Sequence, residues 1–273
     1  MNIVIIGCGY VGSKLADLLQ KHHYVVTCTT RSRKKIATLK QIAQKVAVCK
    51  GSNEKELFEL IERSDGVILT LAADSFEEYK ETYLRTAQSI RHIALKLKRP
   101  KTLIYTGSTA VYGEHQGHWV NEESDLLTTS EPGKILLLTE NTYLSLKSLG
   151  WKICIFRLAE IYGPGRSLDT HIRSLDGHVM AGRGDTFTNL IHVDDVVGAI
   201  FYALQYHLEG IYNLADDDHP LRKDLYDQLC EKYQLPTITW DHHLLKVSRG
   251  NKRVSNHKIK ATGYSLTYPH HIL

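Results

Sequence analysis

The chain opens on IVIIGCGYVG, residues 3–12, and continues directly into SKLADLL, residues 13–19. The first four residues form a β-branched apolar run, which is typical of a buried strand. Apolar side chains then recur at helical spacing, at Val11, Leu15 and Leu18. The order of strand, Gly-x-Gly-x-x-Gly turn and helix predicts the first strand–turn–helix unit of a nucleotide-binding fold.

Each glycine of this turn has a separate purpose in a dinucleotide site. Gly7 permits the tight turn, Gly9 lets the backbone approach a pyrophosphate, and Gly12 lets the helix pack on the strand. N–H groups at the helix start, around Tyr10 and Val11, then face the phosphate charge. The segment predicts dinucleotide binding, and the alternative is a tight turn without a ligand.

The bulk composition describes an ordinary globular protein. The chain has 273 residues, 42% of them hydrophobic and 23% charged, which is enough for one large domain or two lobes. The net charge of +4 is small, and no basic stripe with interleaved aromatic residues is present, so we expect no nucleic-acid partner. No apolar run approaches 18 residues, so we expect no membrane span.

Cysteine and histidine patterns set two further expectations. The five cysteines form no Cys-x-x-Cys pair, and buried free thiols fit a reducing cytoplasm; with no signal peptide expected, the predicted location is cytoplasmic. Three pairs of neighbouring histidines cannot share one helical face, and no His-Glu-x-x-His is present; the pairs are His22-His23, His242-His243 and His270-His271. We therefore expect no metal site.

Short apolar strands alternate with amphipathic helices over the first two-thirds of the chain. This alternation predicts a parallel sheet with helical crossovers. Long helices are expected over Ser75–Lys98, Gly133–Lys147 and Val193–His207, and a last one near Pro220. The predicted strands are Ile3–Ile6, Tyr24–Thr29, Lys45–Cys49, Gly66–Leu71, Thr102–Thr106 and Lys152–Arg157.

Four later segments follow in a specific order. They are TGSTAVYG at 106–113, RLAEIYGPG at 157–165, IHVDD at 191–195 and IYNL at 211–214. Together with the glycine turn, this order resembles the extended short-chain dehydrogenase/reductase superfamily, of the NAD-dependent epimerase/dehydratase type. The resemblance covers nearly the whole chain.

The resemblance implies an α/β fold: a Rossmann-type doubly wound parallel sheet with a smaller C-terminal substrate lobe. The NAD(P)-binding domain would span residues 1–162, with 191–215 returning to it. Residues 163–190 and 216–273 would form the substrate lobe. The family binds NAD or NADP and often forms dimers through two long helices, so we expect a homodimer through Ser75–Lys98 and Gly133–Lys147.

In this family catalysis uses a Ser or Thr together with a Tyr-x-x-x-Lys pair, in which Tyr is the acid/base. Ser108 matches the family Ser and Thr109 is a spare hydroxyl, although either could only hydrogen-bond the turn. The Tyr and Lys positions hold Pro132 and Leu136 instead, neither of which transfers a proton.

The Tyr-x-x-x-Lys spacing recurs at Tyr143 and Lys147, 11 residues further along. That shift is about 16 Å along a helix, so we interpret Tyr143 as a packed helix-surface tyrosine. Candidates for a replacement acid/base share a position near the expected edge of the site: Lys134, Tyr112, Glu160 and Tyr162.

The cofactor type is predicted from the turn after the second strand. Thr29–Arg33 contains no acid for a ribose 2′-hydroxyl, whereas Arg31, beside Ser32, offers a bidentate donor for a 2′-phosphate. The sequence therefore favours NADP over NAD. Lys50 stands where the family usually has an Asp near the adenine. Ala72 and Ala73 match the family's small-residue loop beside the adenosine ribose and pyrophosphate.

The substrate is less well defined. Glu160 replaces an Asn common in members that act on nucleotide sugars, and its charge would repel a substrate diphosphate. We expect a small polar substrate, sugar-like or carbonyl, against a wall formed by residues 250–256. Basic residues in this half of the chain would suit an anionic or polyhydroxylated ligand: Arg166, Arg173, Arg183, Arg249, Lys252 and Arg253.

Two hypotheses of different classes follow. The first is an NAD(P)-dependent oxidoreductase, epimerase or dehydratase with a non-standard acid/base. The second is a catalytically silent NADP-binding sensor or regulatory protein. Flavin or another nucleotide on the same glycine loop is a third alternative.

Overall fold

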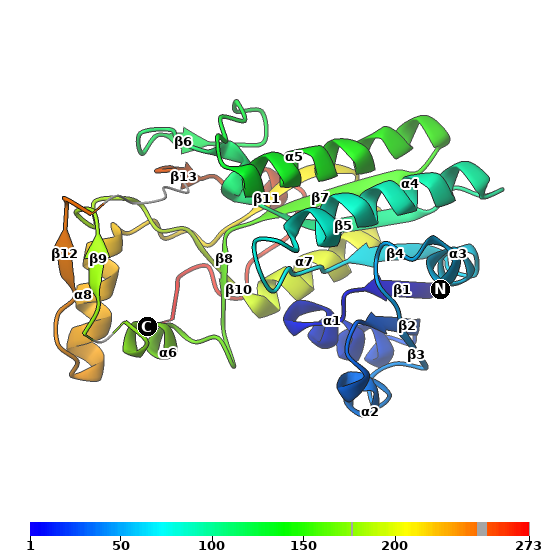
Figure 1. Ribbon diagram of the computed structural model, residues 1–273, viewed down its shortest axis with the longest axis horizontal. Helices are drawn as coiled ribbons and strands as arrows, with labels where there is room; N and C mark the ends of the chain where they lie inside the picture. Colours follow the sequence, from blue (N-terminus) through cyan, green and yellow to red (C-terminus); the bar gives the residue numbers. More distant parts are fainter. Residues whose placement is uncertain (176, 245–249, 273) are drawn as a thin grey trace. The chain divides into compact units, whose positions relative to one another are not determined.

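The computed structural model describes residues 1–175, 177–244 and 250–272 (Figure 1). A seven-stranded sheet has the strand order β11-β7-β5-β4-β1-β2-β3, and β1 pairs in parallel with both β2 and β4. The chain order therefore reverses beside β1, which is the position where doubly wound sheets bind ligands. The strands are β1 (Asn2–Ile6), β2 (Val25–Thr30), β3 (Lys45–Val48), β4 (Gly66–Leu69), β5 (Thr102–Ser108), β7 (Lys152–Leu158) and β11 (Gly210–Leu214).

Helices cover both faces of this sheet, as the alternating pattern predicts (Figure 1). The helix expected over Ser75–Lys98 begins at Lys80 with a π-helical segment, Lys80–Arg85, before α4. The helix expected over Gly133–Lys147 is α5, and it continues as a 3₁₀ turn over Ser145–Leu149. The helices are α1 (Tyr10–Lys21), α2 (Ile36–Leu39), α3 (Glu54–Glu62), α4 (Thr86–Lys96), α5 (Glu131–Leu144) and α7 (Val193–Tyr206).

The sheet core follows from the alternation of side chains along each strand. Alternate residues of β1, β4, β5 and β7 point to one face and pack against α3, α4 and α5. Members of this core include Val4, Ile6, Val67, Leu69, Leu103, Tyr105, Ile153, Ile155, Leu57, Ile90 and Tyr143. Burial of these side chains fixes the carboxyl ends of the strands, where the glycine turn lies.

The chain divides into two compact units. The first comprises Met1–Ser108, Glu131–Arg157 and Val197–Ile211, and the second comprises Thr109–Ser130, Leu158–Val196 and Tyr212–Leu273. The functional division expected from the sequence, a cofactor domain and a substrate lobe, remains a prediction.

The second unit is built from short elements. Three parallel strand pairs are β8 (Glu160–Tyr162) with β10 (Leu190–His192), β9 (Val179–Ala181) with β12 (Thr239–Asp241), and β6 (Trp119–Val120) with β13 (Arg253–Val254). Its helices are α6 (Leu168–Arg173), α8 (Arg222–Tyr233) and α9 (His257–Ala261). The helix expected near Pro220 is therefore α8.

Across residues 1–175, 177–244 and 250–272, no helix combines the length and apolarity that a bilayer crossing requires.

Candidate functional site

The glycine turn has the backbone that the sequence predicts. Gly7 has φ +91°, a conformation that side-chain-bearing residues rarely adopt, and its N–H donates to Thr29 Oγ1 at 3.1 Å. A Cβ on Gly7 would lie 3.1 Å from the carbonyl oxygen of Thr70. The turn is therefore held between the ends of β2 and β4.

Gly9 and Gly12 differ in what surrounds them. A Cβ on Gly12 would lie 2.5 Å from Thr70 Oγ1 and 3.0 Å from the Gly7 carbonyl oxygen, so α1 packs there directly on the sheet edge. A Cβ on Gly9 would meet only the Gly7 oxygen, at 4.0 Å, among the described residues. The space beside Gly9 therefore suits a ligand that approaches the backbone.

The start of α1 is not capped by a side chain. Gly9 is the N-cap, no side chain caps the helix, and the first turn contains no acidic residue. Val11 is buried and Tyr10 is half-buried. The first N–H groups of a helix have no intrahelical acceptor, so this terminus fits the pyrophosphate of a dinucleotide.

Arg31 is exposed at the end of β2, but its guanidinium is engaged. Nη2 donates to Asp74 Oδ2 and Nη1 donates to Glu78 Oε2, both at 2.7 Å. The hydrogen bond to Glu78 raises the pKa of Arg31 and lowers that of Glu78. The role of Arg31 as a phosphate ligand remains a prediction. The sequence pattern could not place these two acids beside it, because they lie 43 and 47 positions away along the chain.

The other residues predicted to contact the adenosine half of the cofactor are neighbours of Arg31 or of Asp74 in the sequence. Ser32 is half-buried, and its N–H donates to Thr30 Oγ1 at 3.1 Å. Ala72 is exposed and Ala73 is half-buried, in the segment between β4 and Asp74.

Ser108 is the last residue of β5 and is half-buried. Thr109 begins a 3₁₀ turn, Thr109–Tyr112, and is half-buried as well. Tyr112 is fully buried, and its hydroxyl lies 2.7 Å from Asn213 Oδ1 within the second unit. Of these three candidates, Tyr112 is thus committed to an internal hydrogen bond.

The beginning of α5 offers little proton-transfer chemistry. Leu136, at the family's Lys position, is buried, and Pro132 is half-buried. Lys134 is exposed and donates to Glu131 Oε1 at 2.8 Å, as a surface pair in the first turn of the helix. Lys134 is thus a surface lysine at the helix start, and its role as a replacement acid/base remains a prediction.

Tyr143 is not the helix-surface tyrosine that the sequence suggests. Its side chain is fully buried in the sheet core, and its ring lies 5.0 Å from that of Tyr105. Burial raises the pKa of Tyr143 well above its ordinary value. Tyr143 lies on the face of α5 that is buried against the sheet. Periodicity alone does not distinguish a fully buried position on a helix from a half-exposed one.

A buried ion pair lies beside the end of β5. Arg157 Nη2 donates to Glu140 Oε2 at 2.8 Å, and both side chains are almost completely buried. Burial raises the pKa of Glu140, and Arg157 opposes that shift. A Cβ on Gly107 would lie 3.1 Å from Glu140 Oε1, so the pair supports the strand immediately before Ser108. The sequence pattern did not indicate this pair, because the two residues are 17 positions apart.

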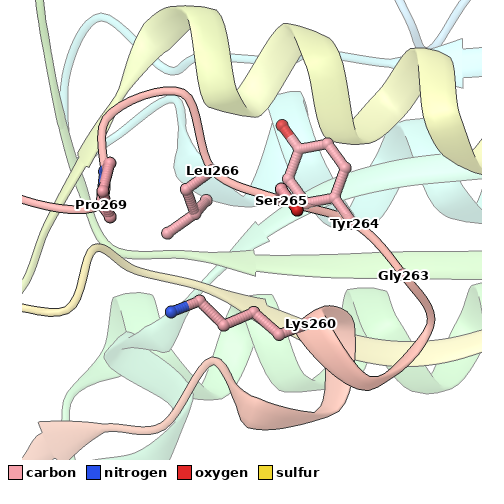
Figure 2. Close-up of a pocket in the computed structure, with 6 residues that line it drawn as sticks. All are labelled: Lys260, Gly263, Tyr264, Ser265, Leu266 and Pro269. Atoms are coloured by element: carbon pink, nitrogen blue, oxygen red, sulfur yellow. The ribbon is translucent and has the colours of Figure 1, made fainter.

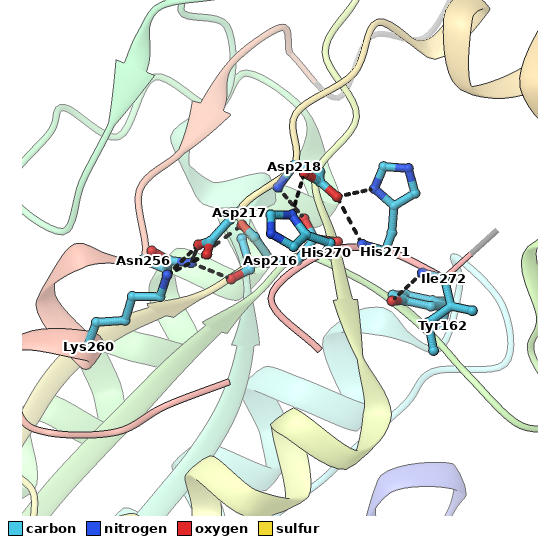
Figure 3. A network of polar contacts seen from close by, with 10 residues as sticks. Tyr162, Asp216, Asp217, Asp218, Asn256, Lys260, His270, His271 and Ile272 are labelled. Atoms are coloured by element: carbon cyan, nitrogen blue, oxygen red, sulfur yellow. Dashed lines mark hydrogen bonds and ion pairs between the residues drawn. The ribbon is translucent and has the colours of Figure 1, made fainter. Parts of the chain in front are cut away.

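In the second unit a polar network ties down the C-terminal segment (Figure 3). Asp218 binds the Nδ1 of His270 at 2.9 Å and the backbone N–H of His271 at 3.0 Å. The N–H of Ile272 donates to the Tyr162 hydroxyl at 3.2 Å. Burial raises the pKa of Tyr162 to about 12, so this candidate keeps its proton at neutral pH. Glu160 is exposed.

Residues 250–256, the expected substrate wall, contact other segments of the second unit through their side chains. Lys252 is buried with Nζ 3.3 Å from the Gly113 carbonyl oxygen. The Arg253 guanidinium lies over the rings of Trp119 and Phe187, at 5.1 and 4.8 Å from their centroids. The remaining basic candidates are Arg166, Arg173 and Arg183, which are exposed, and Arg249, which lies outside the described residues.

A pocket in the second unit is lined by Lys260, Gly263, Tyr264, Ser265, Leu266 and Pro269 (Figure 2). Two of its polar side chains are engaged: Tyr264 donates to the Asp195 carbonyl oxygen at 2.8 Å, and Lys260 Nζ lies 2.6 Å from Asp217 Oδ2. No residue predicted for the site lines it.

The structure also brings together Asp241, His242 and His243, whose ligand atoms lie within 4.8 Å of one another. The two histidines are in a turn, so the helical-face argument against adjacent pairs does not apply to them. Their ring centroids lie 3.9 Å apart with the rings tilted by 40°, and both side chains are exposed.

Comparisons with known proteins agree with this geometry. The family model described as NAD dependent epimerase/dehydratase family matches residues 3–215. Protein YeeZ of Escherichia coli K12 is 31% identical over 242 residues, covering 84% of this chain and 82% of that protein.

Two solved structures share the fold at lower identity. One is dTDP-glucose 4,6-dehydratase of Bacillus anthracis in complex with NAD, at 17% identity and TM-score 0.82, covering 98% of this chain and 92% of that one. The other is UDP-glucuronic acid 4-epimerase of Bacillus cereus with UDP-glucuronic acid and NAD, at 20% identity and TM-score 0.82, covering 98% and 94%.

Proposed function

The chain belongs to the NAD-dependent epimerase/dehydratase family, and from that premise we propose that it binds a nicotinamide dinucleotide and acts on a small polar carbonyl or alcohol substrate. The substrate would be sugar-like or a simple carbonyl compound. The acid/base would differ from the family's Tyr-x-x-x-Lys pair, whose positions hold Pro132 and Leu136.

The glycine turn is the observation that carries this proposal. Gly7 makes the turn, Gly12 packs α1 against Thr70, and the space beside Gly9 is open at an uncapped helix terminus. The first N–H groups of a helix that no side chain caps suit the pyrophosphate of NAD or NADP. When bound, the dinucleotide would supply hydride transfer.

Ser108 is the residue to which we assign the substrate oxygen. It ends β5 at the carboxyl edge of the sheet, and its position is supported through Gly107 by the buried Glu140–Arg157 pair. Its hydroxyl would hydrogen-bond the substrate carbonyl or hydroxyl, with Thr109 as a second hydroxyl of the same loop. A fixed hydroxyl orients the substrate oxygen and stabilises charge that develops on it.

A catalytically silent dinucleotide sensor is the second candidate. Leu136, at the family's Lys position, cannot move a proton, and the Tyr112 hydroxyl is hydrogen-bonded to Asn213. Both observations favour this candidate. Such a protein would bind the dinucleotide and use it as a signal rather than as a reactant.

The two candidates separate in one series of measurements. Calorimetric titration with NAD⁺, NADH, NADP⁺ and NADPH comes first, and absence of binding to all four would refute the dinucleotide site. Turnover over a panel of aldehydes, ketones and sugars is then followed in two ways: by cofactor absorbance for net oxidation or reduction, and by chromatography of the substrate for epimerisation or dehydration, which leave the cofactor unchanged. An enzyme predicts turnover that Ser108→Ala abolishes while cofactor affinity stays within about threefold. Tight binding without turnover on the panel supports the sensor.

A further inference from the structure

Two acids from the segment after β4 occupy the place where the cofactor's adenosine ribose would be discriminated. Asp74 and Glu78 both bind Arg31 at 2.7 Å, one at each terminal nitrogen of its guanidinium. Arg31 directly follows β2, whose end is the position at which doubly wound folds meet the ribose 2′-substituent. All three residues belong to the first unit.

We propose that Asp74 and Glu78 act as the specificity-determining residues of the dinucleotide site and select NAD(H) over NADP(H). This inference rests on the proposed dinucleotide site. The chain lacks the acid that usually follows β2, and the two carboxylates reach the same place from a separate segment. Arg31 is then the positioning residue that holds them there.

Charge decides the direction of the preference. A 2′-phosphate brings two further negative charges beside two carboxylates, and it finds the guanidinium already hydrogen-bonded at both ends. A 2′-hydroxyl is neutral and can donate to a carboxylate oxygen that Arg31 leaves unused. Lys50 adds one positive charge near Glu78 and only partly offsets the two acids.

The size of the preference for NAD(H) follows from the solvent exposure of the three charged side chains. Asp74 is 81% exposed, Glu78 is 46% exposed and Arg31 is 39% exposed, so each pair is open to solvent and weak. Two such pairs can be displaced by a phosphate, and the acids therefore shift the affinity ratio without excluding NADP. We expect a preference on the order of tenfold.

Calorimetric titration with NAD⁺ and with NADP⁺ tests this on the intact protein. In Asp74→Asn/Glu78→Gln, affinity for NADP⁺ should rise about tenfold and affinity for NAD⁺ should stay level or fall, because the repulsion is removed and Arg31 is released. Adding Arg31→Ala to that variant should cancel the gain for NADP⁺. Glu81→Gln, an exposed acid of the same segment, is the matched control and should leave the ratio unchanged.

These titrations distinguish failure of the dinucleotide site from failure of its proposed preference for NAD(H). If the unmodified protein binds neither dinucleotide, the proposed function itself fails. If it binds them but prefers NADP⁺, or if the double variant leaves the ratio of the two dissociation constants unchanged, the acids do not set specificity. In that case Arg31 would be the open phosphate ligand that the sequence suggests.

Discussion

The hydroxyl of Tyr112 donates to Asn213 Oδ1 at 2.7 Å, between residues 101 positions apart in the chain. The amide nitrogen of Asn213 donates onward to the Ser255 carbonyl oxygen, and both residues are fully buried. The tyrosine of the VYG motif thus joins three segments of the second unit. This geometry favours a structural role over the acid/base role considered from the sequence.

Replacing Tyr112 with Phe should therefore cost stability rather than chemistry. The change leaves the buried Asn213 oxygen without this donor, so the free energy of unfolding should fall by about 1–3 kcal/mol. Urea denaturation measures the loss, and Tyr206→Phe, at a 63% exposed position, is the control that should change little. Unchanged stability together with lost turnover would instead identify Tyr112 as the acid/base.

Gly9→Ala should weaken dinucleotide binding, whereas Gly12→Ala should lower the stability of the fold. At Gly9 the new methyl meets open space, so stability should hold while dinucleotide affinity falls at least about tenfold, because the methyl stands where the pyrophosphate approaches. At Gly12 the methyl meets Thr70 Oγ1 at 2.5 Å, and overpacking should destabilise the fold by about 1–3 kcal/mol.

The cause of the destabilisation in Gly12→Ala can be tested with a second substitution. Combining Gly12→Ala with Thr70→Ala removes the nearer of the two clashes, so part of the lost stability should return, although the Gly7 carbonyl oxygen remains at 3.0 Å. Thermal unfolding and titration with NAD⁺ give the two readouts. Equal loss of stability in Gly9→Ala and Gly12→Ala would contradict the different surroundings of these glycines.

Asp216 should make stability depend on pH. Burial, with a smaller contribution from Asp218, raises its pKa to about 8, and its Oδ2 has no hydrogen-bond partner among the described residues. The unfolded chain releases this proton near pH 4 and the folded chain near pH 8. The contribution to stability is thus complete below pH 4 and is lost as pH rises toward 8, at up to about 1.4 kcal/mol per pH unit.

Asp216→Asn removes that titration. The variant should gain stability relative to the unmodified protein as pH rises from 5 to 8, when both are followed by urea denaturation across the range. Exposed Asp185→Asn is the control and should track the unmodified protein. Parallel curves for all three proteins would show that Asp216 does not carry a raised pKa.

A homodimer through α4 and α5 remains a prediction. These helices pack against each other in the first unit, and each exposes a leucine: Leu95 is 58% exposed and Leu138 is 53% exposed. Burial of such side chains against a second copy would favour association. Leu95→Glu/Leu138→Glu should convert a dimer into a monomer by light scattering, whereas Val179→Glu in the second unit should not. A monomeric unmodified protein would refute the interface.

The strands of the sheet could be predicted from the sequence because their signal is local. Runs such as Ile3–Ile6 and Thr102–Thr106 are apolar over the length of a buried parallel strand, and each lies where a strand is found. The glycine turn was predictable for the same reason, since φ at Gly7 and the packing of Gly12 depend on residues close in sequence or on the neighbouring strand.

The partners of charged and hydroxyl groups were decided by the tertiary structure alone. Arg31 was visible in the sequence, but Asp74 and Glu78 reach it only because β4 lies beside β1 in the sheet. Tyr143 had the spacing of a helix surface, and only packing against Tyr105 shows it to be core. Periodicity and propensity act over a few residues, whereas pairing of charges and burial of side chains depend on which distant segments meet. The sequence by itself thus determined the family, the sheet and the dinucleotide loop, and the tertiary structure decided which side chains remain available for chemistry.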